Sequence, residues 1–118
     1  MLSSMPLETL ETQMRKGVLE YCVLGLLEDQ PRYGYELVQH LAGADGLLTS
    51  EGTIYPLLAR MRREALVVTE WQESTSGPPR RYYRLSADGR RGLREFRSSW
   101  KRFVTGVESV IGKEGDPE

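Results

Sequence analysis

The stretch Leu48–Val67, LTSEGTIYPLLARMRREALV, decides the fold that the sequence predicts. Its apolar residues recur at i, i+3, i+4, i+7 and i+11, the spacing of a buried stripe on one helix. These residues are Ile54, Leu57, Leu58, Met61 and Ala65. Ser50 is a suitable N-cap, and Glu51 suits the positive end of the helix dipole. Pro56 lacks a backbone N–H, so we expect a bend or a weak point in the second turn.

The opposite face of this helix combines small residues with basic and hydrogen-bonding groups. It carries Gly52, Pro56, Ala59 and Arg63, flanked by Thr53, Tyr55 and Arg60. Such a face can lie close against a negatively charged surface. An ordinary amphipathic helix with a solvated basic face has the same pattern, so these residues alone leave both interpretations open.

Two further helices are expected upstream of this stretch. The first begins near Gly17, and its apolar residues recur at helical spacing until Asp29-Gln30-Pro31 ends it. These residues are Leu19, Cys22, Val23, Leu26 and Leu27. The second helix spans Tyr35–Ala42, with Leu37, Val38 and Leu41 on its apolar side. The glycine-containing turn 43–46 then leads to the central helix, which gives a helix-turn-helix arrangement.

A β-hairpin is expected after the central helix. Val67–Glu73 and Arg80–Leu85 are rich in β-branched or aromatic residues, and the polar segment 74–79 joins them. Strand alternation places Arg80, Tyr82 and Arg84 together on one face, which we expect to point outward. Three helices followed by such a hairpin form a winged helix-turn-helix.

The last helix begins after Ser86, a suitable N-cap, and carries a second apolar pattern. Its apolar residues are spaced 3, 4, 3, 4 and 3 apart, as in a heptad seam. The seam consists of Leu93, Phe96, Trp100, Phe103, Val107 and Val110. Packing against its own domain would explain the seam, but so small a domain already has other elements for its core. We therefore expect dimerisation through this helix.

The expected fold class is mostly α with a small β-hairpin wing, a winged helix-turn-helix followed by a dimerisation helix. We divide the chain into an N-terminal arm (1–15), a DNA-binding domain (16–86), a dimerisation helix (87–111) and a disordered acidic tail (112–118). The arm could include a short helix through Leu7, Leu10 and Met14.

Charge is distributed unevenly along the 118 residues, although the net charge is only −1. Residues 60–102 hold twelve basic and five acidic side chains, a net charge of +7, whereas residues 1–59 and 103–118 carry −5 and −3. This asymmetry favours a surface that faces a polyanion.

Several classes of protein do not fit the sequence. It has no apolar run long enough to cross a membrane and no signal-peptide pattern, so we expect a cytoplasmic protein. The single cysteine, Cys22, excludes an intrachain disulfide, and His40 lacks a second histidine or cysteine at ligand spacing. No nucleophile–base pair, metal set or phosphate-binding glycine loop is visible, so we expect no catalytic residues, no metal, no cofactor and no enzyme activity.

The chain resembles the PadR-like transcriptional regulators of bacteria. The resemblance covers roughly Lys16–Val110 and rests on LEYCVLGLL, RYGYEL, SEGTIYPLLARMRREALV and SGPPRRYYRLSADG in that order. The single short C-terminal helix is similar to that of the smaller subfamily. The resemblance implies a homodimeric repressor that binds an inverted-repeat operator, with the third helix in the major groove of double-stranded DNA and the wing on the backbone and adjacent minor groove.

Carried over by motif position, the implied DNA-binding residues lie on the central helix, the wing and the YGYEL motif. They are Ser50, Gly52, Thr53, Tyr55, Pro56 and Arg60, then Arg80, Arg81 and Tyr82, and finally Tyr33 and Tyr35. Glu51 departs from the family pattern, which often has a small residue or proline there. A carboxylate aimed at phosphate would weaken affinity. The alternative function is a winged-helix dimer that serves as a protein-interaction module, whose binding would depend much less on salt.

Trp100 lies in the middle of the seam, so its counterpart across a two-fold axis would lie nearby. Two indoles with a flat slot between them would suit a planar aromatic effector. The chain is similar here to multidrug-sensing members of the family, whose central-helix tryptophans sandwich flat drugs. Phe96, Phe103, Leu19 and Val23 would line the same space. Alternatively, Trp100 simply fills the dimer core.

Overall fold

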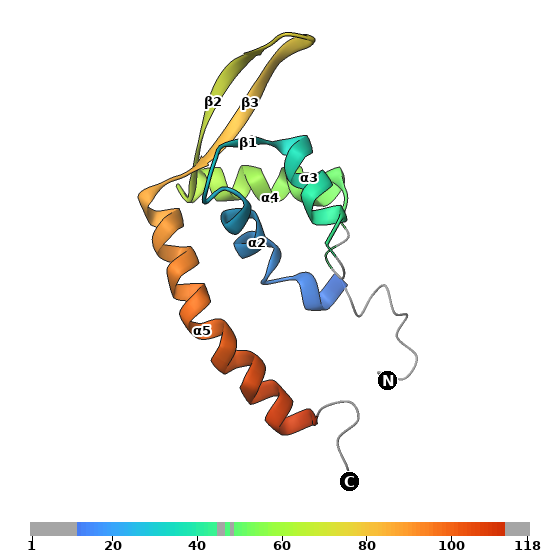
Figure 1. Cartoon of the computed structure of the whole chain (residues 1–118), viewed down its shortest axis with the longest axis vertical. Coiled ribbons are helices and arrows are strands. Elements are labelled where there is room, and N and C mark those ends of the chain that lie inside the picture. The colour runs from blue at the N-terminus through green and yellow to red at the C-terminus, as the bar shows by residue number, and fades with distance from the viewer. Residues whose placement is uncertain (1–11, 45–46, 48, 113–118) are drawn as a thin grey trace.

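The structure is a computed structural model, and it describes residues 12–44, 47 and 49–112. In chain order its elements are α2 (Leu19–Leu26), β1 (Arg32–Tyr33), α3 (Gly34–Ala42), α4 (Glu51–Arg63), β2 (Val67–Ser74), β3 (Gly77–Leu85) and α5 (Ala87–Ile111). Helices α2, α3 and α4 form a cluster from which the β2–β3 wing and α5 extend in opposite directions (Figure 1). The molecule is therefore elongated, with extents of 59 × 30 × 23 Å. The predicted winged helix-turn-helix fold with a C-terminal helix is confirmed.

The core lies where the three helices meet the base of the wing and the start of α5. It is built from the apolar stripes of α2, α3 and α4, as the 3.6-residue periodicity predicts. Its fully buried side chains are Val23, Leu24, Leu27, Leu37, Ile54, Leu58, Met61 and Val67. Tyr83 and Leu85 close the core from β3.

Helix α4 begins after its predicted N-cap but ends earlier than the sequence suggests. It begins after Ser50, which has the extended backbone of an N-cap but no side-chain capping hydrogen bond, and it passes through Pro56. It ends at Arg63, so the expectation that Ala65 continues the buried stripe is wrong: Ala65 is exposed and has a positive φ of 61°. The Leu66 N–H bonds to the Met61 carbonyl and the Ala65 N–H to that of Arg62, the pattern of a Schellman C-cap that turns the chain into β2.

The sheet is larger than the predicted hairpin. Its strand order is β1-β3-β2, all antiparallel, and the two residues of β1 pair with Tyr82 and Tyr83. The expected loop 74–79 is mostly strand, because Ser74 already pairs with Gly77 and only two residues form the turn. Pro78 and Pro79 are tolerated in β3 because they lie next to a register irregularity and beyond the end of β1.

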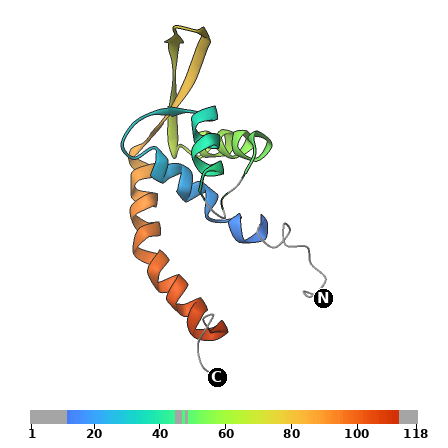
Figure 2. The same cartoon turned by 45° about the vertical axis from the view of Figure 1, so that its right-hand side comes forward.

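Helix α5 begins at the predicted cap. The Ser86 hydroxyl accepts a hydrogen bond from the Gly89 N–H at 2.9 Å and donates one to the Ala65 carbonyl at 2.7 Å. A Cβ on Gly89 would overlap the Leu66 carbonyl oxygen, so only glycine permits this close approach between α5 and the chain that enters β2. The N-terminal half of α5 runs alongside α2, and the C-terminal half extends away from the domain (Figure 2).

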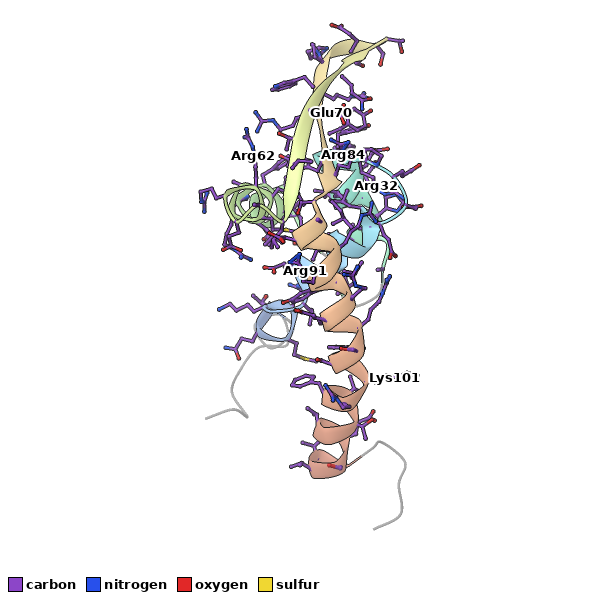
Figure 3. The ribbon with its side chains drawn as sticks, turned by 90° about the vertical axis from the view of Figure 1, so that its left-hand side faces the viewer. Arg32, Arg62, Glu70, Arg84, Arg91 and Lys101 are labelled. Atoms are coloured by element: carbon purple, nitrogen blue, oxygen red, sulfur yellow. The ribbon has the colours of Figure 1, made fainter. Side chains whose placement is uncertain are left out.

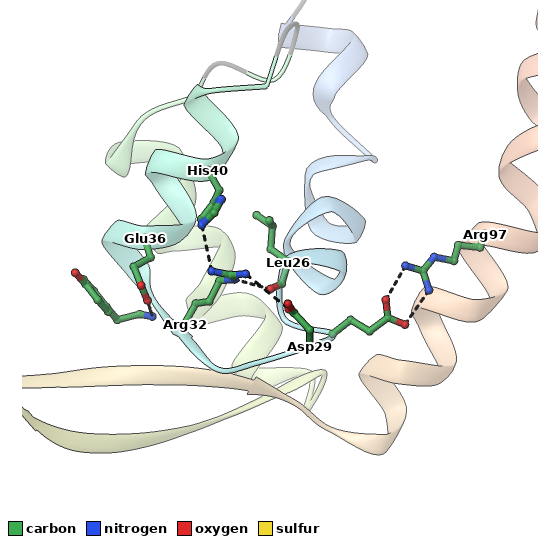
Figure 4. A network of polar contacts seen from close by, with 8 residues as sticks. Leu26, Asp29, Arg32, Glu36, His40 and Arg97 are labelled. Atoms are coloured by element: carbon green, nitrogen blue, oxygen red, sulfur yellow. Dashed lines mark hydrogen bonds and ion pairs between the residues drawn. The ribbon is translucent and has the colours of Figure 1, made fainter.

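An ion pair fixes α5 against the end of α2. The two terminal nitrogens of Arg97 donate to the two carboxylate oxygens of Glu28 at 2.8 and 2.9 Å (Figure 4). The hydrogen bonds from Arg97, together with the positive charges of Arg97 and Arg90, lower the pKa of Glu28 below its ordinary value. This bidentate contact links α5 to the end of α2 at the solvent-exposed surface of the domain.

We expect the contribution of Glu28 to stability to depend on pH. Because its folded-state pKa is lowered, the contribution is present above the unfolded-state pKa and is lost as pH falls through the folded-state pKa. Glu28→Gln should therefore lower the Tm at about pH 7 and lose this effect near pH 3. Glu95→Gln is the matched control, because it removes an exposed carboxylate from α5 that forms no ion pair with the residues that the structure describes. An equal Tm difference for Glu28→Gln at both pH values would contradict the assignment.

The remaining expectations fall at the edges of the fold. Residues 12–15 are helical, and the rest of the predicted arm, like residues 113–118 of the predicted tail, lies outside the described residues. His40 is exposed on α3, with Nε2 3.1 Å from a terminal nitrogen of Arg32. Arg32 also donates to the Leu26 carbonyl at 2.7 Å, which joins α3 to the end of α2 (Figure 4). Cys22 is half-buried and free, and burial raises the pKa of its thiol.

Candidate nucleic-acid interface

The N-terminal half of α4 presents a polar, open surface. Ser50, Gly52, Thr53 and Pro56 are all exposed, as predicted for residues that meet a ligand rather than the core. A Cβ on Gly52 would meet only the Ser50 hydroxyl at 3.6 Å, so the backbone itself is accessible here. Glu51 is exposed in the same turn.

Tyr55 is held at the junction of α4 and α3. Its ring lies directly on Gly34, the first residue of α3, where a Cβ would overlap the ring, and the side chain is 41% exposed. Partial burial, with a smaller effect from the negative charge of Glu51, raises the pKa of the Tyr55 hydroxyl. The hydroxyl therefore stays protonated at neutral pH and can donate a hydrogen bond to a phosphate or base edge.

Arg60 forms ion pairs within the protein. Its guanidinium donates to Glu20 of α2 at 2.7 Å and to Glu64 at 3.0 Å, and both contacts raise its pKa. The structure thus places this predicted DNA-binding arginine in an ion-pair network that joins α4 to α2. The Glu64 contact follows from the i,i+4 spacing in the sequence, whereas the Glu20 contact spans 40 residues and needs the fold.

The predicted wing residues divide between the two faces of the sheet. On one face the Tyr33 and Tyr82 rings meet edge to face with centroids 5.4 Å apart, and the Arg80 guanidinium lies 4.4 Å from the Tyr33 centroid. On the other face Arg81 lies 5.0 Å from the ring centroid of Trp71, its cross-strand partner. Tyr35 is exposed on α3, and the contacts of the described residues do not connect it to either group.

A hollow of about 330 Å³ lies between the C-terminal half of α4 and the wing. It is lined by Ala59, Arg62, Arg63, Arg81 and Tyr83. In Figure 3 the Arg62 side chain extends from α4 along the side of the wing. Arg62, Arg63 and Trp71 are absent from the set predicted by motif position. The net charge of +7 over residues 60–102 indicates a basic surface, but only the fold shows which of these arginines lie together.

A second predicted site, the space for an aromatic effector beside Trp100, lies on α5. The rings of Phe96, Trp100 and Phe103 follow one another along the helix, with centroids 5.2 and 6.1 Å apart. An apolar groove of about 350 Å³ runs beside them, lined by Met14, Gly17, Val18, Phe96, Ser99, Trp100 and Phe103. Tyr21 of α2 stacks on Phe96 at 4.3 Å. Leu19 and Val23, predicted to line this space, are instead buried in the core of the domain.

The apolar seam of α5 has a buried part and an exposed part. Leu93 is only 4% exposed because it packs in the domain core, so its expected place in a dimer contact is wrong. From Trp100 onward the seam is open, with Phe103 63% and Val110 83% exposed, and Val107 and Ile111 exposed beside them. An uncovered apolar stripe of this length on a helix that leaves its domain is typical of an interface.

Other chemistry finds no support within the described residues. No group of three or more histidine, cysteine or acidic side chains there is placed to hold a metal ion. No helix in residues 12–44 or 49–112 is long and apolar enough to cross a membrane.

Comparison with known proteins points to one family. The profile of the Transcriptional regulator PadR-like family matches residues 23–95. Transcriptional regulator Rv3488 of Mycobacterium tuberculosis is 33% identical over 95 residues, which cover 80% of this chain and 87% of that protein. The solved PadR-like transcriptional regulator of Bacillus cereus is 41% identical with a TM-score of 0.76, covering 86% of this chain and 99% of that one. A PadR family regulator of Eggerthella lenta is 34% identical with a TM-score of 0.78, and the match covers 91% of this chain and 93% of that one.

Proposed function

This chain belongs to the PadR-like family of DNA-binding transcriptional regulators, and on that premise we propose that it is a homodimeric repressor of an inverted-repeat operator. The observation that carries the proposal is the exposed N-terminal half of α4, whose hydrogen-bonding side chains stand on a helix fixed by the core. Helix α4 enters the major groove, and Thr53 and Tyr55 supply contacts to base edges or phosphates.

The dimer forms through α5. The open seam from Trp100 to Ile111 lies on the part of α5 that extends beyond the domain, where a second copy of the helix can cover it (Figure 1). A two-fold dimer presents two α4 helices, so its operator is an inverted repeat with half-site centres about one helical turn apart.

A planar aromatic effector binds between the α5 helices of the two protomers. The support is the groove beside Phe96, Trp100 and Phe103, which is apolar, open at the seam and lined by stacked aromatic rings. An aromatic ligand there would continue the stack that Tyr21 and Phe96 begin. Its binding releases the operator if it favours a dimer in which the two α4 helices have a different spacing.

Selection of duplexes from a random pool by the wild-type protein tests the repressor proposal without knowledge of the target gene. We expect enrichment of a two-fold symmetric sequence, and binding to it, followed by fluorescence anisotropy, should weaken steeply between about 50 and 200 mM salt. Thr53→Ala should weaken binding to the selected duplex by roughly tenfold or more, since a base-edge contact is worth about 1–3 kcal/mol.

Thr105→Ala on α5 makes the same chemical change away from α4 and should leave binding to the selected duplex intact. No enriched sequence, with binding insensitive to salt, would replace the repressor by the protein-interaction module. Equal binding by Thr53→Ala and Thr105→Ala would remove α4 from the interface.

A further inference from the structure

Two sets of arginines in this protein have different surroundings. Among the described residues Arg32, Arg60, Arg84, Arg91 and Arg97 each form an ion pair with a carboxylate. Arg62, Arg63 and Arg81 form no ion pair within the described part of the chain, yet they line one hollow of about 330 Å³ from two different elements. Three converging positive charges without a carboxylate repel one another, so the hollow favours an anion.

The wing extends this hollow with an apolar surface. Trp71 pairs with Arg81 across the strands, and the Arg81 guanidinium lies 5.0 Å from the centre of its indole ring. Trp71 is 64% exposed, although its neighbours on the same face, Val67 and Tyr83, are buried. The face of the wing that turns toward α4 therefore carries a large exposed indole next to Arg81, the residue through which it adjoins the arginine hollow. Trp71 itself lines a separate hollow nearer the tip of the wing, with Gln72, Glu73, Pro78 and Pro79.

We infer that this hollow and Trp71 together grip the sugar–phosphate backbone of duplex DNA, an inference that rests on the proposed DNA-binding function. One phosphate enters the hollow between Arg62, Arg63 and Arg81, and the neighbouring deoxyribose packs on the Trp71 indole. A nucleic-acid strand alternates anionic phosphates with apolar sugar faces, which matches an arginine cluster next to an exposed indole. Arg60, bound to Glu20 and Glu64, takes no part in this grip.

These contacts position the protein without reading sequence, and this gives the inference a specific signature. The Arg62→Ala/Arg63→Ala double variant should weaken binding to the selected operator and to random duplex by the same factor. The slope of log K against log salt should become shallower by up to about 2, since the dimer has two such hollows, each holds one phosphate, and each neutralised phosphate contributes about 0.9. The matched control is Arg90→Ala/Arg94→Ala, which removes two exposed arginines of α5 and should leave the slope unchanged.

The place of Trp71 is tested by fluorescence, because the chain has only two tryptophans. In Trp100→Phe all tryptophan emission comes from Trp71, and saturating duplex should protect it from acrylamide quenching. Trp71→Phe leaves Trp100 as the only emitter, and duplex should not protect Trp100 in the same way.

The outcomes separate this inference from the function on which it rests. If wild-type protein binds duplex with a steep salt slope but the Arg62→Ala/Arg63→Ala variant keeps that slope, the hollow is not a phosphate site. If Trp71 is quenched equally with and without duplex, the sugar contact is wrong. If wild-type protein does not bind duplex at all, the proposed function itself fails.

Discussion

Replacing Phe103 with arginine should convert the dimer to a monomer and remove tight operator binding. Phe103 is 63% exposed, so the domain keeps its fold and its Tm, while a charge in the middle of an apolar seam cannot be buried at a two-fold contact. Two half-sites bound by one dimer gain roughly 10²–10⁴ over separate binding events, so we expect affinity for the selected operator to fall by about 100-fold or more. Light scattering and fluorescence anisotropy measure the two effects.

The control for this variant is Thr105→Arg, which adds the same side chain two residues later on the opposite side of α5. It should remain dimeric and bind as the wild type does. A new positive charge raises non-specific attraction to DNA, so a loss of affinity in Phe103→Arg cannot come from the charge itself. If the Phe103→Arg variant remains dimeric, α5 is not the dimer interface.

Gly89→Ala should be the most destabilising single change outside the hydrophobic core. The new methyl group would overlap the Leu66 carbonyl oxygen and press on Leu85, so α5 would have to move away from the chain that enters β2. Overpacking of this kind costs about 1–3 kcal/mol, and a backbone partner cannot rotate away, so we expect roughly 3 kcal/mol and a fall in Tm of about 10 °C.

Gly92→Ala provides a matched change one turn later. Its methyl group would meet only a Leu24 side-chain carbon at 3.9 Å, an ordinary contact, so the higher helix propensity of alanine should leave stability unchanged or raise it by up to about 1 kcal/mol. Thermal unfolding followed by circular dichroism measures both variants. Equal Tm values for the two would show that α5 can shift freely against the wing.

Periodicity predicted the helices because it reports which residues share a face. Ile54, Leu58 and Met61 are all fully buried, as their spacing requires. The same rule failed at Ala65, because a Schellman turn ends α4 two residues earlier and depends on backbone hydrogen bonds that apolar spacing does not encode. At Leu93 the spacing was correct but the partner was wrong, since a heptad does not distinguish a packing face within the chain from one between chains.

The sequence predicted the parts of the candidate site that depend on one helix. It did not predict the parts that depend on contacts between residues far apart in the sequence. The exposed residues at the start of α4 follow from helix geometry, but the capture of Arg60 by Glu20 depends on contacts across 40 residues. The convergence of Arg62, Arg63 and Arg81 depends on the crossing of α4 and the wing. The prediction made from the family motif therefore included Arg60 but neither Arg62 nor Arg63.

Helix α2 has a double attachment that makes it more than a core element. Glu20 holds Arg60 of α4 at 2.7 Å, and the next residue, Tyr21, stacks on Phe96 of α5 at 4.3 Å. Helix α4, which we propose binds the operator, and the wall of the α5 groove are thus joined to successive residues of one eight-residue helix. A small rotation of α2 about its axis alters both contacts at once. If an effector binds in the groove as proposed, its effect on α4 therefore has to cross only the thickness of a single helix.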